Sequence, residues 1–97
     1  SHLYKMNKDS LVSKIANSSS FSRHRSELIF DRIFELIKES LVKDKGFSVD
    51  NFGEFKVEHR ESMKIMNTKE NQEVLLPPKD FISFTPSQNL LDIINKK

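Results

Sequence analysis

Residues 46–57 read GFSVDNFGEFKV, and this stretch decides the fold. Its apolar side chains alternate with polar or charged ones, which is the period of a half-buried β-strand. One face of the strands is expected to carry Phe47, Val49, Phe55 and Val57. Asn51-Phe52-Gly53 separates the two runs, and glycine readily adopts the positive φ of a tight turn. The stretch therefore predicts an antiparallel hairpin with one apolar face.

Two helices are expected before this hairpin. Asn7 is a suitable N-cap for a first helix of about ten residues, which should end in the polar run 17–20. Ser22 is expected to cap a second, longer helix, with Gly46 at the C′ position that follows it. Apolar side chains recur in that helix at three- and four-residue steps, at Phe30, Ile33, Phe34, Ile37 and Leu41.

After the hairpin, strand character returns over residues 74–76 and again over 81–84, interrupted by Pro77-Pro78. The segment before it, residues 58–73, is polar and cannot bury a face of its own, so we interpret it as part of an extended two-stranded arm over about residues 58–75. Thr85, followed by Pro86, is expected to start a short final helix. The order is helix, helix, three strands with an arm, and helix.

Composition limits the class of protein. The chain has 97 residues and no cysteine, so packing alone must stabilise it, and oligomerisation would complete a small core. We expect residues 1–5 to be a tag remnant or N-terminal extension and 6–97 to form one domain. No apolar run suits a membrane helix, and cytoplasm is the default compartment. The formal net charge is +2, which by itself does not indicate nucleic-acid binding.

Several short motifs, in this order, resemble the HU/integration host factor family of bacterial nucleoid proteins. They are Met6-Asn7-Lys8, Lys14-Ile15-Ala16, Glu39-Ser40-Leu41, Phe52-Gly53-x-Phe55 and Ser83-Phe84, in a register without gaps from Met6 to Asn95. The resemblance implies an α+β fold in an intertwined dimer, with a helical base, a saddle of three-stranded antiparallel sheets and protruding β-arms. It also implies a histone-like architectural protein whose arms enter the minor groove of double-stranded DNA without strong sequence preference.

The resemblance also implies roles for particular residues. DNA contacts are expected from Lys8, Arg23, Arg60, Lys64, Asn67, Lys69 and Lys79. The dimer core is expected to contain Phe30, Phe34, Ile37, Phe47, Phe52, Phe55 and Phe84. Thr68 stands where the family has a wedge proline and Met66 where it has an arginine, so sharp kinking is not expected. Ile65, Met66 and Thr68 are the candidate arm-tip wedge.

No enzyme chemistry is predicted. The three histidines have no partners at metal-ligand spacing, and the two glycines form no phosphate loop, so we expect no catalytic residues, metal, cofactor or small-molecule substrate. A helix-turn-helix reader is a rival class, but the second helix is apolar around much of its girth. The remaining alternative is a dimeric protein-interaction module with weakened or lost DNA binding. A heterodimer with a paralogue also stays open.

Overall fold

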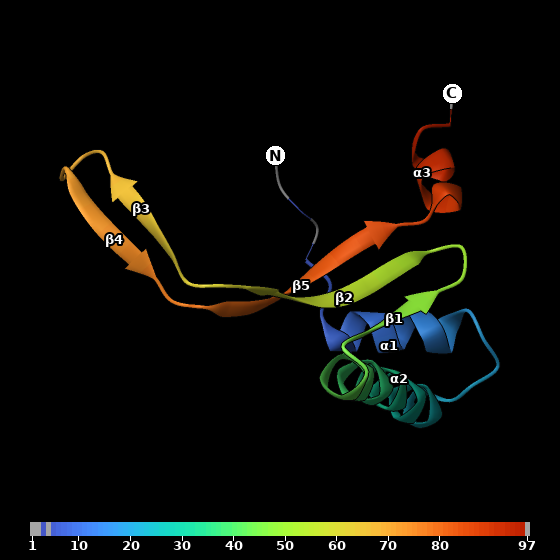
Figure 1. The fold of residues 1–97 in the computed structure, drawn as a ribbon. Coiled ribbons are helices and arrows are strands. Elements are labelled where there is room, and N and C mark those ends of the chain that lie inside the picture. The colour runs from blue at the N-terminus through green and yellow to red at the C-terminus, as the bar shows by residue number, and fades with distance from the viewer. Residues whose placement is uncertain (1–2, 4, 97) are drawn as a thin grey trace. The chain divides into compact units, whose positions relative to one another are not determined.

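The fold comes from a computed structural model that describes residue 3 and residues 5–96. These residues form three helices and five strands, an α+β arrangement, as Figure 1 shows. The chain divides into two compact units, residues 1–38 and 39–97, each treated separately below. Of the expected extension at residues 1–5, residues 1, 2 and 4 lie outside the described residues.

The first unit contains α1 (Lys8–Asn17) and most of α2 (Arg23–Lys43). Asn7 caps α1, and its side-chain oxygen accepts a hydrogen bond from the Ser10 amide at 2.8 Å. Ser22 caps α2 by accepting from the Arg25 amide at 3.1 Å. Both caps confirm the expected helix starts, because each satisfies an amide that lacks an intrahelical partner.

The second unit contains a sheet in the order β1–β2–β5, formed by β1 (Gly46–Val49), β2 (Gly53–Arg60) and β5 (Lys79–Pro86). Phe47 faces Phe55 across the first ladder, and Phe55 faces Phe84 across the second. Paired residues share a face, so the expected alternation is confirmed. We name the side carrying Phe47, Phe55, Val57, Ile82 and Phe84 the apolar sheet face.

Both glycines serve purposes other than those expected. The left-handed residue after α2 is Lys45 (φ 60°), whereas Gly46 opens β1 with φ 148°. In the hairpin turn the positive φ belongs to Asn51 (61°). Gly53 is needed for space, because a Cβ there would lie 2.5 Å from Phe84 Cε1 and 2.6 Å from the Thr85 carbonyl oxygen. The turn lies where it was predicted, but Asn51 adopts the positive φ that was expected of Gly53.

The arm is a separate two-stranded ribbon, formed by β3 (Met63–Asn67) and β4 (Gln72–Leu76). In Figure 1 it extends away from the three-stranded sheet of the same unit. One boundary differs from expectation, because residues 58–60 pair with β5 and belong to the sheet. At the other end, residues 74–76 pair with β3, close to the expected arm limit at residue 75.

The final helix, α3 (Gln88–Ile94), is capped by Ser87 instead of Thr85. Ser87 Oγ accepts a hydrogen bond from the Leu90 amide at 3.1 Å. Thr85 is still paired with Glu54 in the sheet, and Pro86 ends β5 instead of opening the helix. The ladder thus continues two residues further than the capping motif suggested.

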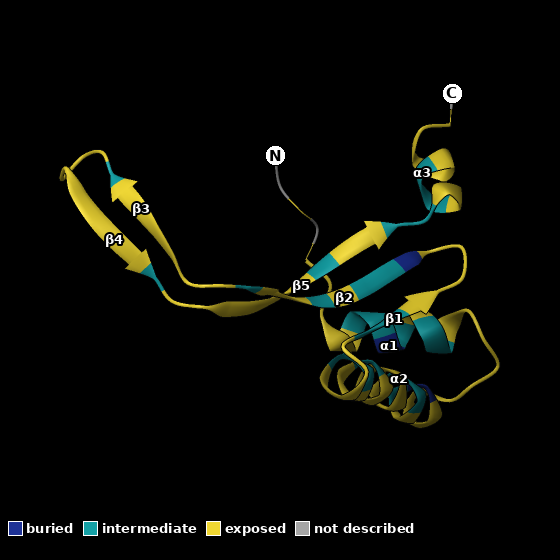
Figure 2. Ribbon diagram, viewed as in Figure 1, coloured by how far each residue is buried: buried dark blue, intermediate teal, exposed yellow. Residues whose placement is uncertain are grey.

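Fully buried side chains are scarce. Among the described residues, Val12 is the only fully buried apolar side chain and Ser26 its polar counterpart. Figure 2 shows most other positions as intermediate or exposed. Because an exposed apolar face gains nothing from the hydrophobic effect, the described residues obtain little stabilisation from a core of their own.

Candidate nucleic-acid interface

The side of the sheet opposite Phe47, Phe55 and Phe84 carries most of its charge. Glu54, Lys56, Glu58 and Arg60 alternate with the apolar residues of β2, and Lys79 faces Arg60 on β5. We name this set, with Phe81, Ser83 and Thr85, the polar sheet face. It combines three cations with two carboxylates and is the most cationic surface that the described sheet offers.

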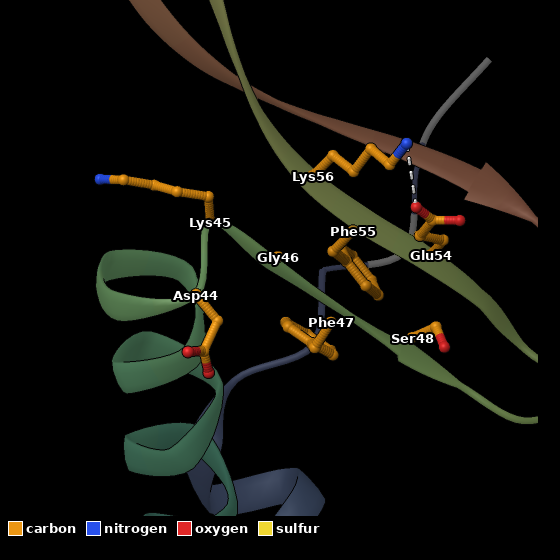
Figure 3. A pocket seen from close by; sticks show the side chains of 8 residues that line it. All are labelled: Asp44, Lys45, Gly46, Phe47, Ser48, Glu54, Phe55 and Lys56. Carbon is orange, nitrogen blue, oxygen red and sulfur yellow. Dashed lines mark ion pairs between the residues drawn. The ribbon is translucent and has the colours of Figure 1, made fainter.

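Lys56 belongs to this face and was missed by the sequence prediction. Its Nζ lies 3.2 Å from Glu54 Oε1, a pair that Figure 3 marks with a dashed line. Strict alternation after Phe55 would have placed Lys56 on the same side as Arg60. The family resemblance points to residues of the arm, whereas Lys56 could have been found from the two-residue period of the strand alone.

Behind that ion pair, the apolar sheet face holds a cluster of phenylalanines. The rings of Phe47 and Phe55 stack with centroids 5.0 Å apart, and they lie side by side in Figure 3. Phe84 adds a tilted contact to Phe55 at 4.7 Å and another to Phe52 at 5.5 Å. In the first unit Phe30 and Phe34 form a similar pair at 4.6 Å.

Several predicted core residues remain half exposed despite these contacts. The exposed fractions are 43% for Phe34, 45% for Phe52 and 42% for Phe84. Phe30, Ile37, Phe47 and Phe55 are intermediate. Aromatic rings left this open are typical of a surface that another chain covers.

The arm presents exposed side chains on both faces. Met63, Ile65, Val74 and Leu76 share one face, and Lys64, Met66, Glu73 and Leu75 share the other. Among the candidate wedge residues Met66 is 58% exposed and Ile65 41%. Thr68 lies in the turn between the two strands. All three are therefore accessible, although their role as a wedge stays a prediction.

Asn67 shapes the arm tip. Its side-chain oxygen accepts hydrogen bonds from the amides of Lys69 at 3.1 Å and Glu70 at 3.3 Å. This is how asparagine side chains stabilise tight turns. Asn71 closes the turn with φ 54°. Asn67 thus stabilises the turn at the arm tip, in addition to the DNA contact expected of it, and its hydrogen bond fixes the backbone of Lys69 there.

Two predicted cationic contacts in the first unit are paired with carboxylates. Lys8 Nζ lies 2.9 Å from Asp31 and 3.8 Å from Glu27, and the hydrogen bond to Asp31 raises the pKa of Lys8. Arg23 donates to Asp9 at 2.9 Å and to Ser13 at 2.6 Å. A phosphate would have to compete with these partners.

The remaining predicted contacts lie in the second unit. Lys64 and Lys69 are exposed on the arm, and Lys79 is exposed at the start of β5. Arg60 is half-buried, and its Nη2 donates to the Pro77 carbonyl at 2.8 Å. The structure thus brings Arg60 and Lys79 together on the polar sheet face, while Lys64 and Lys69 lie along the arm.

The described residues were expected to form no metal site. No group of three potential metal ligands occurs among them. The hollow drawn in Figure 3 is open to solvent and lined by Asp44, Lys45, Gly46, Phe47, Ser48, Glu54, Phe55 and Lys56. None of the described helices has the length and apolar content that a membrane span requires.

Comparison with known proteins places this geometry in a family. Residues 6–95 match the family described as bacterial DNA-binding protein, and the chain belongs to it. It is 30% identical over 90 residues to DNA-binding protein HRL53 of Rhizobium leguminosarum, covering 93% of this chain and 99% of that protein. It is 29% identical over 89 residues to DNA-binding protein HU of Geobacillus stearothermophilus, covering 92% and 99%.

A solved structure confirms the fold. The HU of an Anabaena HU–DNA cocrystal structure superimposes with a TM-score of 0.78 at 21% sequence identity, covering 95% of this chain and 100% of that one. The expected HU-like α+β fold with its protruding β-arm is therefore confirmed. The DNA contacts expected of individual residues stay predictions.

Proposed function

We propose that this chain is an architectural DNA-binding protein of the bacterial nucleoid that acts as a dimer and binds double-stranded DNA with little sequence preference. The observation that carries the proposal is the exposed arm, which continues from the same strands that form the cationic polar sheet face. Such a ribbon has no core of its own, and its shape suits the minor groove of DNA. Relatives named DNA-binding protein support the assignment.

The acidic residues of the arm limit its affinity for DNA. The arm and the segments that join it to the sheet, residues 61–78, contain Lys64 and Lys69 but also Glu61, Glu70 and Glu73. Each neutralised phosphate contributes about 0.9 to the slope of log K against log salt. Because the glutamates repel phosphate close to the two lysines, we expect weak binding with a shallow salt dependence. Sharp, wedge-driven bending is not part of the proposal.

Dimerisation is proposed from the half-exposed aromatic rings. A second copy would bury Phe34, Phe52 and Phe84, and about 25 cal/mol is gained per Å² of apolar surface removed from water. The midpoint of thermal unfolding should therefore rise with protein concentration, since dissociation accompanies unfolding. Sedimentation equilibrium should give twice the chain mass. A monomer with an unchanged midpoint across concentrations would refute the dimer.

The test of DNA binding is a titration of linear, nicked and bent duplexes at about 50 mM and about 200 mM salt. We expect binding to all three at the lower salt, and tighter binding to the nicked and bent duplexes because less deformation energy is required. No binding at the lower salt would favour a dimeric protein-interaction module instead. Mixing with a more basic family member would then test for a heterodimer.

A further inference from the structure

The backbone ladder is interrupted where the arm leaves the sheet. The β2–β5 ladder ends with Arg60 facing Lys79, and the β3–β4 ladder begins with Met63 facing Leu76. Between them lie Glu61 and Ser62 on one strand and Pro77 and Pro78 on the other. We name these four residues the arm base. Proline has no amide hydrogen, so Pro77 and Pro78 cannot donate to a ladder here.

One side chain bridges this interruption. Arg60 is the last residue of β2, and its guanidinium Nη2 donates to the carbonyl of Pro77 at 2.8 Å. The hydrogen bond joins the end of β2 to the strand that returns from the arm. It supplies a cross-strand link where backbone donors are missing, and a charged donor makes it stronger than an amide would.

The inner nitrogen of the Arg60 guanidinium is enclosed by protein. Arg60 Nε is buried and has no hydrogen-bond partner among the described residues. A phosphate outside the protein cannot reach a buried nitrogen without moving the side chain. Lys79, which faces Arg60 across the ladder, is exposed, so a phosphate can reach it.

We infer that Arg60 is a positioning residue, which sets the direction of the arm by tying Pro77 to the end of β2, and that phosphate contact falls to the exposed lysines. The inference deepens the proposed function and rests on it for the DNA measurements only. A loosely attached arm would have to be ordered each time it enters a groove, and this conformational entropy opposes binding. Arg60 reduces that loss before DNA arrives.

The test compares Arg60→Met with a matched control, Lys64→Met, in the full chain. Both substitutions remove one positive charge and keep an unbranched side chain. Without DNA, Arg60→Met should speed amide hydrogen exchange in β3, β4 and the first residues of β5 by about fivefold or more, whereas Lys64→Met should leave it unchanged. Arg60→Lys, which retains donors of similar reach, should restore part of the protection.

DNA titrations separate positioning from contact. Arg60→Met should weaken binding about three- to tenfold with an unchanged salt slope, because the bound state neutralises the same phosphates. Lys64→Met should lower the slope by about 1.8 per dimer. A lowered slope with unchanged exchange in Arg60→Met would overturn the inference and make Arg60 a phosphate contact. If the unmodified protein fails to bind DNA, the proposed function fails, but the exchange experiment still decides whether Arg60 positions the arm.

Discussion

His59 Nδ1 lies 2.6 Å from Oδ1 of Asp80, its partner across the β2–β5 ladder, while His59 Nε2 lies 3.2 Å from Glu61 Oε1. The hydrogen bond to Asp80 is the main cause of a raised His59 pKa, and the charges of Glu61 and Asp80 add to it. A histidine between two carboxylates, which favour its protonated form, therefore stands next to Arg60 where the sheet ends and the arm base begins.

The first prediction concerns pH. Because folding raises the pKa of His59 above its ordinary value of 6.5, its stabilising contribution is fully present below that value and is lost as pH rises through the folded-state pKa. Asp80→Asn should therefore destabilise the protein more at about pH 6 than at about pH 8.5. Chemical unfolding at both pH values measures this, and an NMR titration of the His59 ring should show a lower pKa in the variant. An equal loss at both pH values would contradict the prediction.

Substitution of Gly53 tests the packing of the hairpin against β5. In Gly53→Ala the new Cβ would meet Phe84 and the Thr85 carbonyl, and the latter is backbone that cannot rotate away. We expect a loss of about 1–3 kcal/mol in the free energy of unfolding, as for other overpacked sites. Ser48→Ala, at an exposed position of β1, is the control and should stay within about 0.5 kcal/mol. Urea unfolding gives both values, and similar stability in the two variants would refute the close approach.

Replacement of Met66 tests the candidate wedge. Met66→Ser removes an exposed apolar side chain near the arm tip, and Met63→Ser removes the same side chain at the start of β3. If Met66 inserts between base steps, its loss should lower both the bend angle, measured by fluorescence transfer between duplex ends, and the affinity, while Met63→Ser should not. An unchanged bend with unchanged affinity in Met66→Ser would eliminate the wedge.

Release of Lys8 tests its part in DNA binding. Asp31→Asn removes the closer of its two carboxylate partners and should lower the raised pKa of Lys8. If Lys8 is a phosphate contact, affinity should rise about two- to fivefold at low salt, with a steeper salt slope. Glu35→Gln changes the net charge equally on the same helix but interrupts a pair with Arg32. Equal gains in both variants would show that only net charge matters.

Periodicity predicted most of the fold because side-chain alternation depends on the backbone alone. The facing of Phe47 and Phe55, and the caps at Asn7 and Ser22, follow from local rules. Residues 85–88 were misread because two good N-caps lie close together. Ser87, and not Thr85, caps the helix because Thr85 is paired with Glu54 in the sheet. The local sequence carries no signal of that long-range contact.

The candidate site was harder to predict because the sequence does not show which charged side chains form ion pairs with each other in the fold. Lys8 and Arg23 looked available, yet Asp31 and Asp9 reach them from distant positions. Asn67 and Arg60 were expected to contact DNA, and that stays a prediction, whereas their hydrogen bonds in the structure are with the backbone of Lys69 and Pro77. Lys56 was overlooked because it carries no family motif, although its place in the alternation was readable.

The proline pair at the arm base also bears on self-association. A two-stranded ribbon exposes unpaired amides and carbonyls along both edges, and this one carries apolar side chains such as Ile65 and Leu75. Such edges recruit strands from neighbouring molecules and begin aggregates. Pro77 and Pro78 interrupt the edge after the five residues of β4, so an invading strand could not continue from the arm into β5. The same break that leaves the arm in need of Arg60 thus limits any added strand to the five residues of β4.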